Sequence, residues 1–235
     1  MKRFVPLMAA AWLLVAARAK ADGHTLPDEG LVPPSPERFA AEFRIGLYQP
    51  PIGPPYQALF ESDRGPLVAG EIDAWAYRIP YVGLIGPGFG FGWAKYVGHL
   101  CAAGSTDCSM TATEKATFRL YPMYAAAVLR IDALARYLDI PFVFTGKAGV
   151  DYWRFHSSGG GEGNNFRAGA WGFHWAAQIA LELDVFERSA ANRLDAEWGI
   201  NHSYLFFELY GSTARDGSFT VGDSLAWVAG LGLTF

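Results

Sequence analysis

The sequence has only two cysteines in 235 residues, Cys101 and Cys108. Two cysteines exclude a disulfide-rich scaffold, and their spacing of seven is not the CxxC of a zinc or redox site. Long apolar runs are also lacking: beyond residue 21, no stretch reaches the roughly 18 uninterrupted apolar residues of a transmembrane helix. Because 51% of the residues are hydrophobic, the chain has either a large soluble core or strands that cross a membrane.

The first 21 residues have the pattern of a secretory signal. Two basic residues precede an apolar run at 4–17, and a small-x-small cleavage site at 19–21 precedes Asp22. A retained membrane anchor is the alternative, but the run is short for a spanning helix. No cysteine follows the run, so there is no attachment point of the lipoprotein type. We therefore predict that the protein is exported.

Basic residues are scarce in the predicted mature chain. Removing residues 1–21 takes away four basic residues and no acidic one, so the formal charge falls from −4 to −8. An acidic chain without a basic stripe argues against nucleic acid as a partner.

Aromatic residues alternate with small or polar ones along several stretches. Phe89, Phe91 and Trp93 alternate with glycines, and this period of two places the three rings on one face of a strand. The same period runs through 115–128 and 170–181. A soluble β-sandwich also alternates, but the aromatic density and the run length, near the 9–11 residues of a tilted membrane strand, favour a membrane barrel.

We predict an all-β fold, an eight-stranded antiparallel transmembrane β-barrel with a short periplasmic helix. The barrel would comprise 38–235, after a signal peptide at 1–21 and an N-terminal periplasmic linker at 22–37. An even strand number places both chain ends on the periplasmic side, and apolar residues at every fourth position predict the helix at 185–197. The eight runs lie at about 40–49, 67–79, 82–97, 115–131, 141–156, 166–183, 199–212 and 220–235.

The final run ends on an aromatic residue. Gly230, Leu233 and Phe235 have the spacing of the C-terminal signal by which outer-membrane barrels are recognised for assembly, although Val228 stands where that signal usually has a polar residue. We expect the last strand to close against the first, near Phe39 to Tyr48, because an unpaired edge is not tolerated in lipid.

Three segments resemble a family of small outer-membrane barrel proteins of the myxobacterial type. They are AWAYRIPYVG at 74–83, YAAAVLRIDALARYL at 124–138 and GINHSYLFFELY at 199–210. The resemblance covers most of the mature chain and weakens in the loops. It implies an eight-stranded barrel in the outer membrane and brings no catalytic residue, ligand or partner.

Charged residues within the runs are predicted to face the lumen, because a charge on the lipid face costs a few kcal/mol near the midplane. These residues would form either an ion or proton path or a packed ionic plug. Eight strands leave room only for side chains, so we expect a plug. The predicted lumen residues are Glu42, Arg44, Glu71, Asp73, Arg119, Lys147, Asp151, His174 and Glu208.

The sequence favours a non-enzymatic outer-membrane protein with a structural or surface-interaction role. A lipid-modifying acyl hydrolase and a narrow channel are the alternatives. His174, His202 and Ser203 are the residues that suggest hydrolysis, which needs a serine within hydrogen-bond reach of an imidazole. However, His202 and Ser203 are adjacent, so they point to opposite faces of a strand, and no serine stands out to meet His174.

The expected partners are outer-membrane lipids and, during insertion, the barrel-assembly machinery. The loops at 50–66, 97–114 and 157–165 are candidates to hold an extracellular ligand, and no cofactor or metal is implied. Cys101 and Cys108 lie in one predicted surface loop, where a disulfide fits the oxidising compartment of an exported protein.

Overall fold

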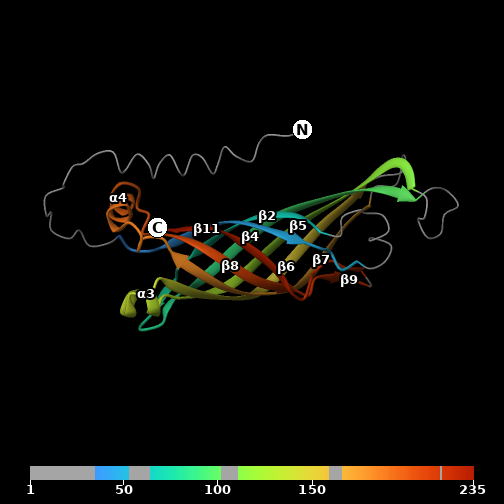
Figure 1. The fold of residues 1–235 in the computed structure, drawn as a ribbon. Coiled ribbons are helices and arrows are strands. Elements are labelled where there is room, and N and C mark those ends of the chain that lie inside the picture. The colour runs from blue at the N-terminus through green and yellow to red at the C-terminus, as the bar shows by residue number, and fades with distance from the viewer. Residues whose placement is uncertain (1–34, 53–63, 102–110, 159–165, 218) are drawn as a thin grey trace.

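The structure is a computed structural model, and the residues that it describes form a β-barrel with two short helices at one end (Figure 1). The predicted signal peptide and all but the last three residues of the predicted linker lie outside the part of the chain that the structure describes. The described residues are 35–52, 64–101, 111–158, 166–217 and 219–235.

Eight long strands pair antiparallel around a closed ring. Each strand pairs with its neighbours along the chain, and the first pairs with the last, so the ring has no open edge. The predicted eight-stranded antiparallel barrel is therefore confirmed. In ring order the strands are β1 (Phe39–Tyr48), β2 (Gly65–Ala74), β4 (Gly83–Cys101), β5 (Thr111–Ile131), β6 (Phe142–Ser158), β7 (Phe166–Glu182), β8 (His202–Ser212) and β11 (Ala226–Thr234).

The seam between β1 and β11 closes the ring, as the sequence predicts. Its register runs from Ala40 opposite Thr234 to Leu47 opposite Trp227. The final residue continues the pairing, because the Phe235 N–H donates to the Phe39 carbonyl at 2.9 Å.

The two helices lie at one end of the barrel, with the start of β1 and the C-terminus (Figure 1). We call this the helix end and the opposite end the long-strand end. The helix predicted at 185–197 is confirmed as α4 (Arg188–Trp198), which begins three residues later. A second helix, α3 (Ala133–Leu138), joins β5 to β6 in the gap between the predicted runs at 115–131 and 141–156. Within the described ranges, no helix is long and apolar enough to cross a membrane.

Three very short strands complete the fold: β3 (Tyr77–Ile79), β9 (Arg215–Asp216) and β10 (Phe219–Thr220). β3 pairs with the start of β4 at the helix end. β9 and β10 pair with each other between β8 and β11, so β11 begins at Ala226 and not at 220 as predicted. Val221 in this connection is fully buried, which shows that the chain folds into the barrel mouth before β11 starts.

The alternation of the sequence separates an outer wall from an interior. On the outer wall, Phe89 is 56% exposed and Phe173 is 50% exposed. Inside, the long-strand half is filled with aromatic side chains that pack on one another, including Tyr48, Phe118 and Phe155. The middle of the interior is polar and charged.

Candidate functional site: the barrel interior and its helix end

Five charged side chains meet in the middle of the barrel and form what we call the ionic core: Glu42 and Arg44 of β1, Glu71 of β2, Lys147 of β6 and Glu208 of β8. All five side chains are at most 3% exposed. Both cations contact the same three carboxylates. Arg44 pairs with Glu42, with Glu71 and, at 2.9 Å, with Glu208. Lys147 Nζ lies 2.8 Å from both Glu71 and Glu208 and 3.4 Å from Glu42.

Neutral polar side chains from β5, β7 and β8 add contacts to two of these carboxylates. Gln178 Nε2 and the Tyr204 hydroxyl donate to Glu42 Oε1 at 2.8 and 2.9 Å, and the Tyr124 hydroxyl donates to Glu71. Buried charges are tolerated when they are paired and hydrogen-bonded. Because these contacts join strands around the ring, the ionic core cross-links the barrel through its interior.

Three more of the predicted lumen residues, Asp73, Asp151 and His174, are buried inside. Among the described residues they take no part in an ion pair. Asp151 accepts a hydrogen bond from Trp153 Nε1 at 3.0 Å. The imidazole of His174 stacks on the Tyr124 ring, with centroids 4.1 Å apart, as expected of a structural lumen residue.

The prediction that Arg119 faces the lumen is wrong. Its neighbours Phe118 and Leu120 are buried inside the barrel, so the alternation of β5 places Arg119 on the outer wall. The cause is the aromatic filling of the long-strand half. There the apolar face of β5 points inward, and the rule that apolar residues face outward is reversed.

Arg130 is an interior cation that is not among the predicted lumen residues. It lies on β5 and is 2% exposed; it pairs with Glu182 at 3.0 Å, and its guanidinium lies over the Tyr204 ring at 4.8 Å. A signal was present in the sequence. Arg119 and Arg130 are eleven positions apart, an odd number, so on one uninterrupted strand they must point to opposite faces.

The interior leaves little free space around the ionic core. A cavity of about 30 Å³ lies between the core and the aromatic half, lined by residues such as Arg44, Trp153 and His174. This volume suits about one water molecule. At the long-strand end, the Tyr48 hydroxyl donates to the Val221 carbonyl, and Phe219 packs on Phe155 with ring centroids 5.0 Å apart.

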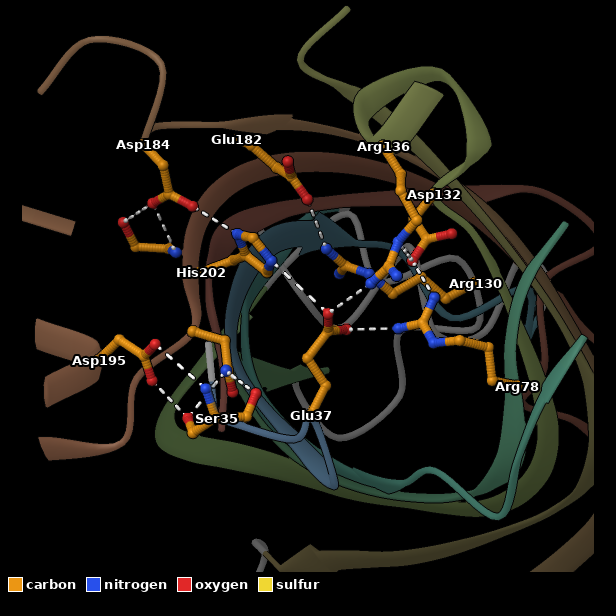
Figure 2. A network of polar contacts seen from close by, with 12 residues as sticks. Ser35, Glu37, Arg78, Arg130, Asp132, Arg136, Glu182, Asp184, Asp195 and His202 are labelled. Carbon is orange, nitrogen blue, oxygen red and sulfur yellow. Dashed lines mark hydrogen bonds and ion pairs between the residues drawn. The ribbon is translucent and has the colours of Figure 1, made fainter. Parts of the chain in front are cut away.

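The helix end is more open, with a cavity of about 590 Å³. Glu37, just before β1, projects into it and meets residues from three different elements (Figure 2). Its carboxylate lies 3.2 Å from Arg78 Nη2, 3.4 Å from Arg136 Nη2 and 3.6 Å from His202 Nε2. We call Glu37, Arg78, Arg136 and His202 the Glu37 cluster. It ties the segment before β1 to β3, α3 and β8.

A second set of contacts holds the same segment to the region of α4. The backbone N–H of Ser35 donates to Asp195 Oδ2 at 3.2 Å, and Asn201 Nδ2 donates to the Ser35 carbonyl at 2.6 Å. Figure 2 shows Ser35 and Asp195 beside the Glu37 cluster. The segment from Ser35 to Glu37 is therefore bound across the mouth of the barrel.

The charge state of Glu37 follows from this setting. Burial would by itself raise the pKa of its carboxyl. The hydrogen bond and charge of His202 and the charges of Arg78 and Arg130 outweigh burial and lower the pKa to about 2. Glu37 is therefore ionised at neutral pH, and its ionised form stabilises the Glu37 cluster.

The geometry at the helix end does not support a hydrolase. His202 Nδ1 faces Asp184 Oδ2, and Ser203 Oγ also contacts Asp184, at 3.5 Å. The aspartate therefore lies between the other two, whereas serine activation requires the imidazole to contact the serine. In the described part of the chain, no group of His, Cys, Asp or Glu side chains is arranged to hold a metal ion.

The remaining predicted sites are only partly described. Phe235 is 40% exposed and Leu233 is half-buried on the outer face of β11, while Gly230 packs closely against the Phe206 ring. Cys108 and most of the three candidate ligand loops lie outside the described residues, so the disulfide and the loop ligand stay predictions.

No protein-family model and no curated protein matches this chain. Several solved structures are similar. Ail, the attachment invasion locus protein of Yersinia pestis, has 11% identity and a TM-score of 0.43, over 85% of this chain and 97% of Ail. Neisserial surface protein A has 13% identity and a TM-score of 0.45, over 86% and 98% of the two chains. The N-terminal barrel domain of Pseudomonas aeruginosa OprF has 10% identity and a TM-score of 0.41, over 85% and 100%. These likenesses are low, and the assignment of a closed barrel depends on the strand pairing alone.

Proposed function

We propose that the chain is an integral outer-membrane β-barrel protein with a structural or surface-interaction role and a lumen plugged by its own side chains. The observation that carries the proposal is the reversed polarity of the barrel. Large apolar side chains cover the outer wall while the charged ionic core is buried. In water such a wall would be one contiguous apolar patch, far larger than soluble monomers expose; in a bilayer it is the expected band of a transmembrane barrel.

The export signal predicted at 1–21 fits this location, and the helix end then faces the periplasm. The resemblance of three segments to the myxobacterial-type barrel family is part of the same proposal. Recognition by the assembly machinery through Gly230, Leu233 and Phe235 is also part of it, and the outward setting of Leu233 and Phe235 supports that recognition.

The closed interior favours a plug over the two alternatives. An aqueous channel would need a continuous path, but the aromatic half and the ionic core together leave a cavity of only about 30 Å³ between them. A hydrolase would need a serine in contact with a histidine, which the contacts of Ser203 with Asp184 do not provide.

Two measurements test the proposal. Outer-membrane fractionation and heat-modifiable gel migration of the mature protein test the membrane barrel, and a purely soluble protein would overturn it. Single-channel recording in a planar bilayer tests the plug. We expect no steady conductance from monomeric protein; a large and persistent current would replace the plug with a channel.

A further inference from the structure

Basic side chains from four neighbouring strands lie together on the outer wall near the long-strand end. The register places Lys95 beside Arg119, Arg119 beside His156, and His156 beside Arg167. All four positions have the outward parity of their strands. Lys115, four residues before Arg119, and Arg154, two residues before His156, have the same parity. We call this set the basic row: Lys95, Lys115, Arg119, Arg154 and Arg167.

Negative charge is missing from the part of this wall whose side chains the structure describes. β4 contains no acidic residue, and neither does β5 from residue 115 onward. Asp151 of β6 points into the barrel, and Glu182 of β7 lies at the helix end. Among the described residues, no carboxylate forms an ion pair with the basic row, whereas Arg44, Lys147 and Arg130 inside are all paired. The adjoining β9 adds one charge of each sign and leaves the balance unchanged.

The basic row begins where an aromatic girdle ends. Trp93, Tyr121, Tyr152 and Trp171 lie on the same outward faces, and the rings of Tyr152 and Trp171 are 4.8 Å apart. Trp and Tyr side chains of membrane proteins sit at headgroup level. Lys95 is the next outward residue after Trp93. With about 3.3 Å per residue and a strand tilt of about 40°, it lies roughly 5 Å further along the barrel axis.

We propose that the basic row binds phosphate groups of an anionic lipid in the outer leaflet of the membrane. This inference rests on the proposed function, because the basic row lies at the level of the lipid headgroups only if the barrel spans a membrane. Guanidinium groups bind phosphate oxygens with paired hydrogen bonds, and basic residues close to an anionic membrane surface are attracted to it. Clustered cations without carboxylates repel one another, and bound phosphates remove that repulsion.

The contact between two members of this wall fits the proposal. Arg167 Nε donates to His156 Nδ1 at 3.2 Å, so the imidazole orients the guanidinium. The two terminal nitrogens of Arg167 stay available for an anion. A purely solvated surface arginine would not need an oriented side chain.

Fluorescence quenching by brominated lipids tests the inference, because Trp93 and Trp171 lie beside the basic row. The mature protein is refolded into phosphatidylcholine vesicles that contain a minor fraction of brominated phosphatidic acid or, in parallel, of brominated phosphatidylcholine. We expect the wild type to be quenched more strongly by the anionic lipid. In K95Q/R119Q/R154Q, the ratio of quenching by brominated phosphatidic acid to quenching by brominated phosphatidylcholine should fall about fivefold. Raising the salt concentration should weaken the preference of the wild type in the same direction.

The matched control, R38Q/R188Q/R193Q, removes the same charge at the helix end and should keep the outer-leaflet preference. R154Q/R167Q provides a second pair if the triple variant does not fold. Heat-modifiable migration is recorded for every sample, so failure to insert counts against the membrane barrel itself. Inserted wild type and K95Q/R119Q/R154Q with equal quenching would overturn the lipid site. Equal wild-type quenching by both brominated lipids, together with tight binding of a soluble polyanion such as heparin, would overturn it in favour of a surface polysaccharide.

Discussion

Replacing Lys147 by methionine tests whether the ionic core holds the barrel together. The ammonium contacts Glu42, Glu71 and Glu208 and is completely buried. Without it, Arg44 is the one cation of the ionic core that still contacts the three carboxylates. Breaking a buried pair costs about 3–5 kcal/mol, since an uncompensated charge stays behind. With a urea slope of about 2 kcal/mol per molar, K147M should unfold from lipid vesicles at a concentration roughly 2 M below that of the wild type.

A double-mutant cycle separates charge balance from packing. E208Q removes one carboxylate, so K147M/E208Q restores the net charge of the core, with two carboxylates and one cation in place of three and two. We expect the double variant to be more stable than K147M, with a coupling of about 1–3 kcal/mol between the two sites. The reasoning is refuted if K147M unfolds within about 0.5 M urea of the wild type, or if the double variant loses the sum of both single effects.

Two further predictions concern the mouth and the packing of the interior. Glu37 has a pKa of about 2 in the folded protein and an ordinary carboxyl value in the unfolded chain. Its contribution of up to about 3 kcal/mol should therefore be complete above pH 4.5 and disappear as the pH falls toward 2. E37Q should unfold earlier than the wild type at pH 7, and the gap in midpoint should narrow below pH 4.5 and close near pH 2; a gap independent of pH would contradict the assignment. At Gly90, a β-carbon would come within 2.2 Å of the Tyr124 ring, so G90A should displace that ring and cost about 1–3 kcal/mol. G146A, which meets nothing within 4 Å, is the control and should unfold like the wild type.

The alternation of aromatic and small residues was sufficient to predict the barrel. It indicates strand positions and strand number, and the pairing of the strand at Phe39–Tyr48 with the last strand follows because a barrel in lipid must close. The helix α4 was predictable for a similar local reason, since apolar residues repeat at every fourth position there. These features depend on neighbours within one segment, which the sequence displays directly.

Features that depend on the content of the interior were not predictable in the same way. The rule that apolar residues face outward fails for Phe118 and Leu120, because the long-strand half of the lumen is filled with aromatic rings, and the prediction for Arg119 is wrong for that reason. The Glu37 cluster joins four segments that are distant along the chain. Nothing near Glu37 in the sequence indicates that Arg78, Arg136 and His202 will surround it.

The seam between β1 and β11 has a consequence for how the molecule is made. Its partners, such as Ala40 and Thr234, are almost two hundred positions apart, so closing the ring is the least local contact of the fold. Loop-closure entropy makes such contacts slow to form. Until that seam forms, β1 and β11 each keep one unsatisfied row of backbone groups, which can pair with other chains. The time before seam formation is therefore the period in which the two edge strands are most exposed to pairing with other chains.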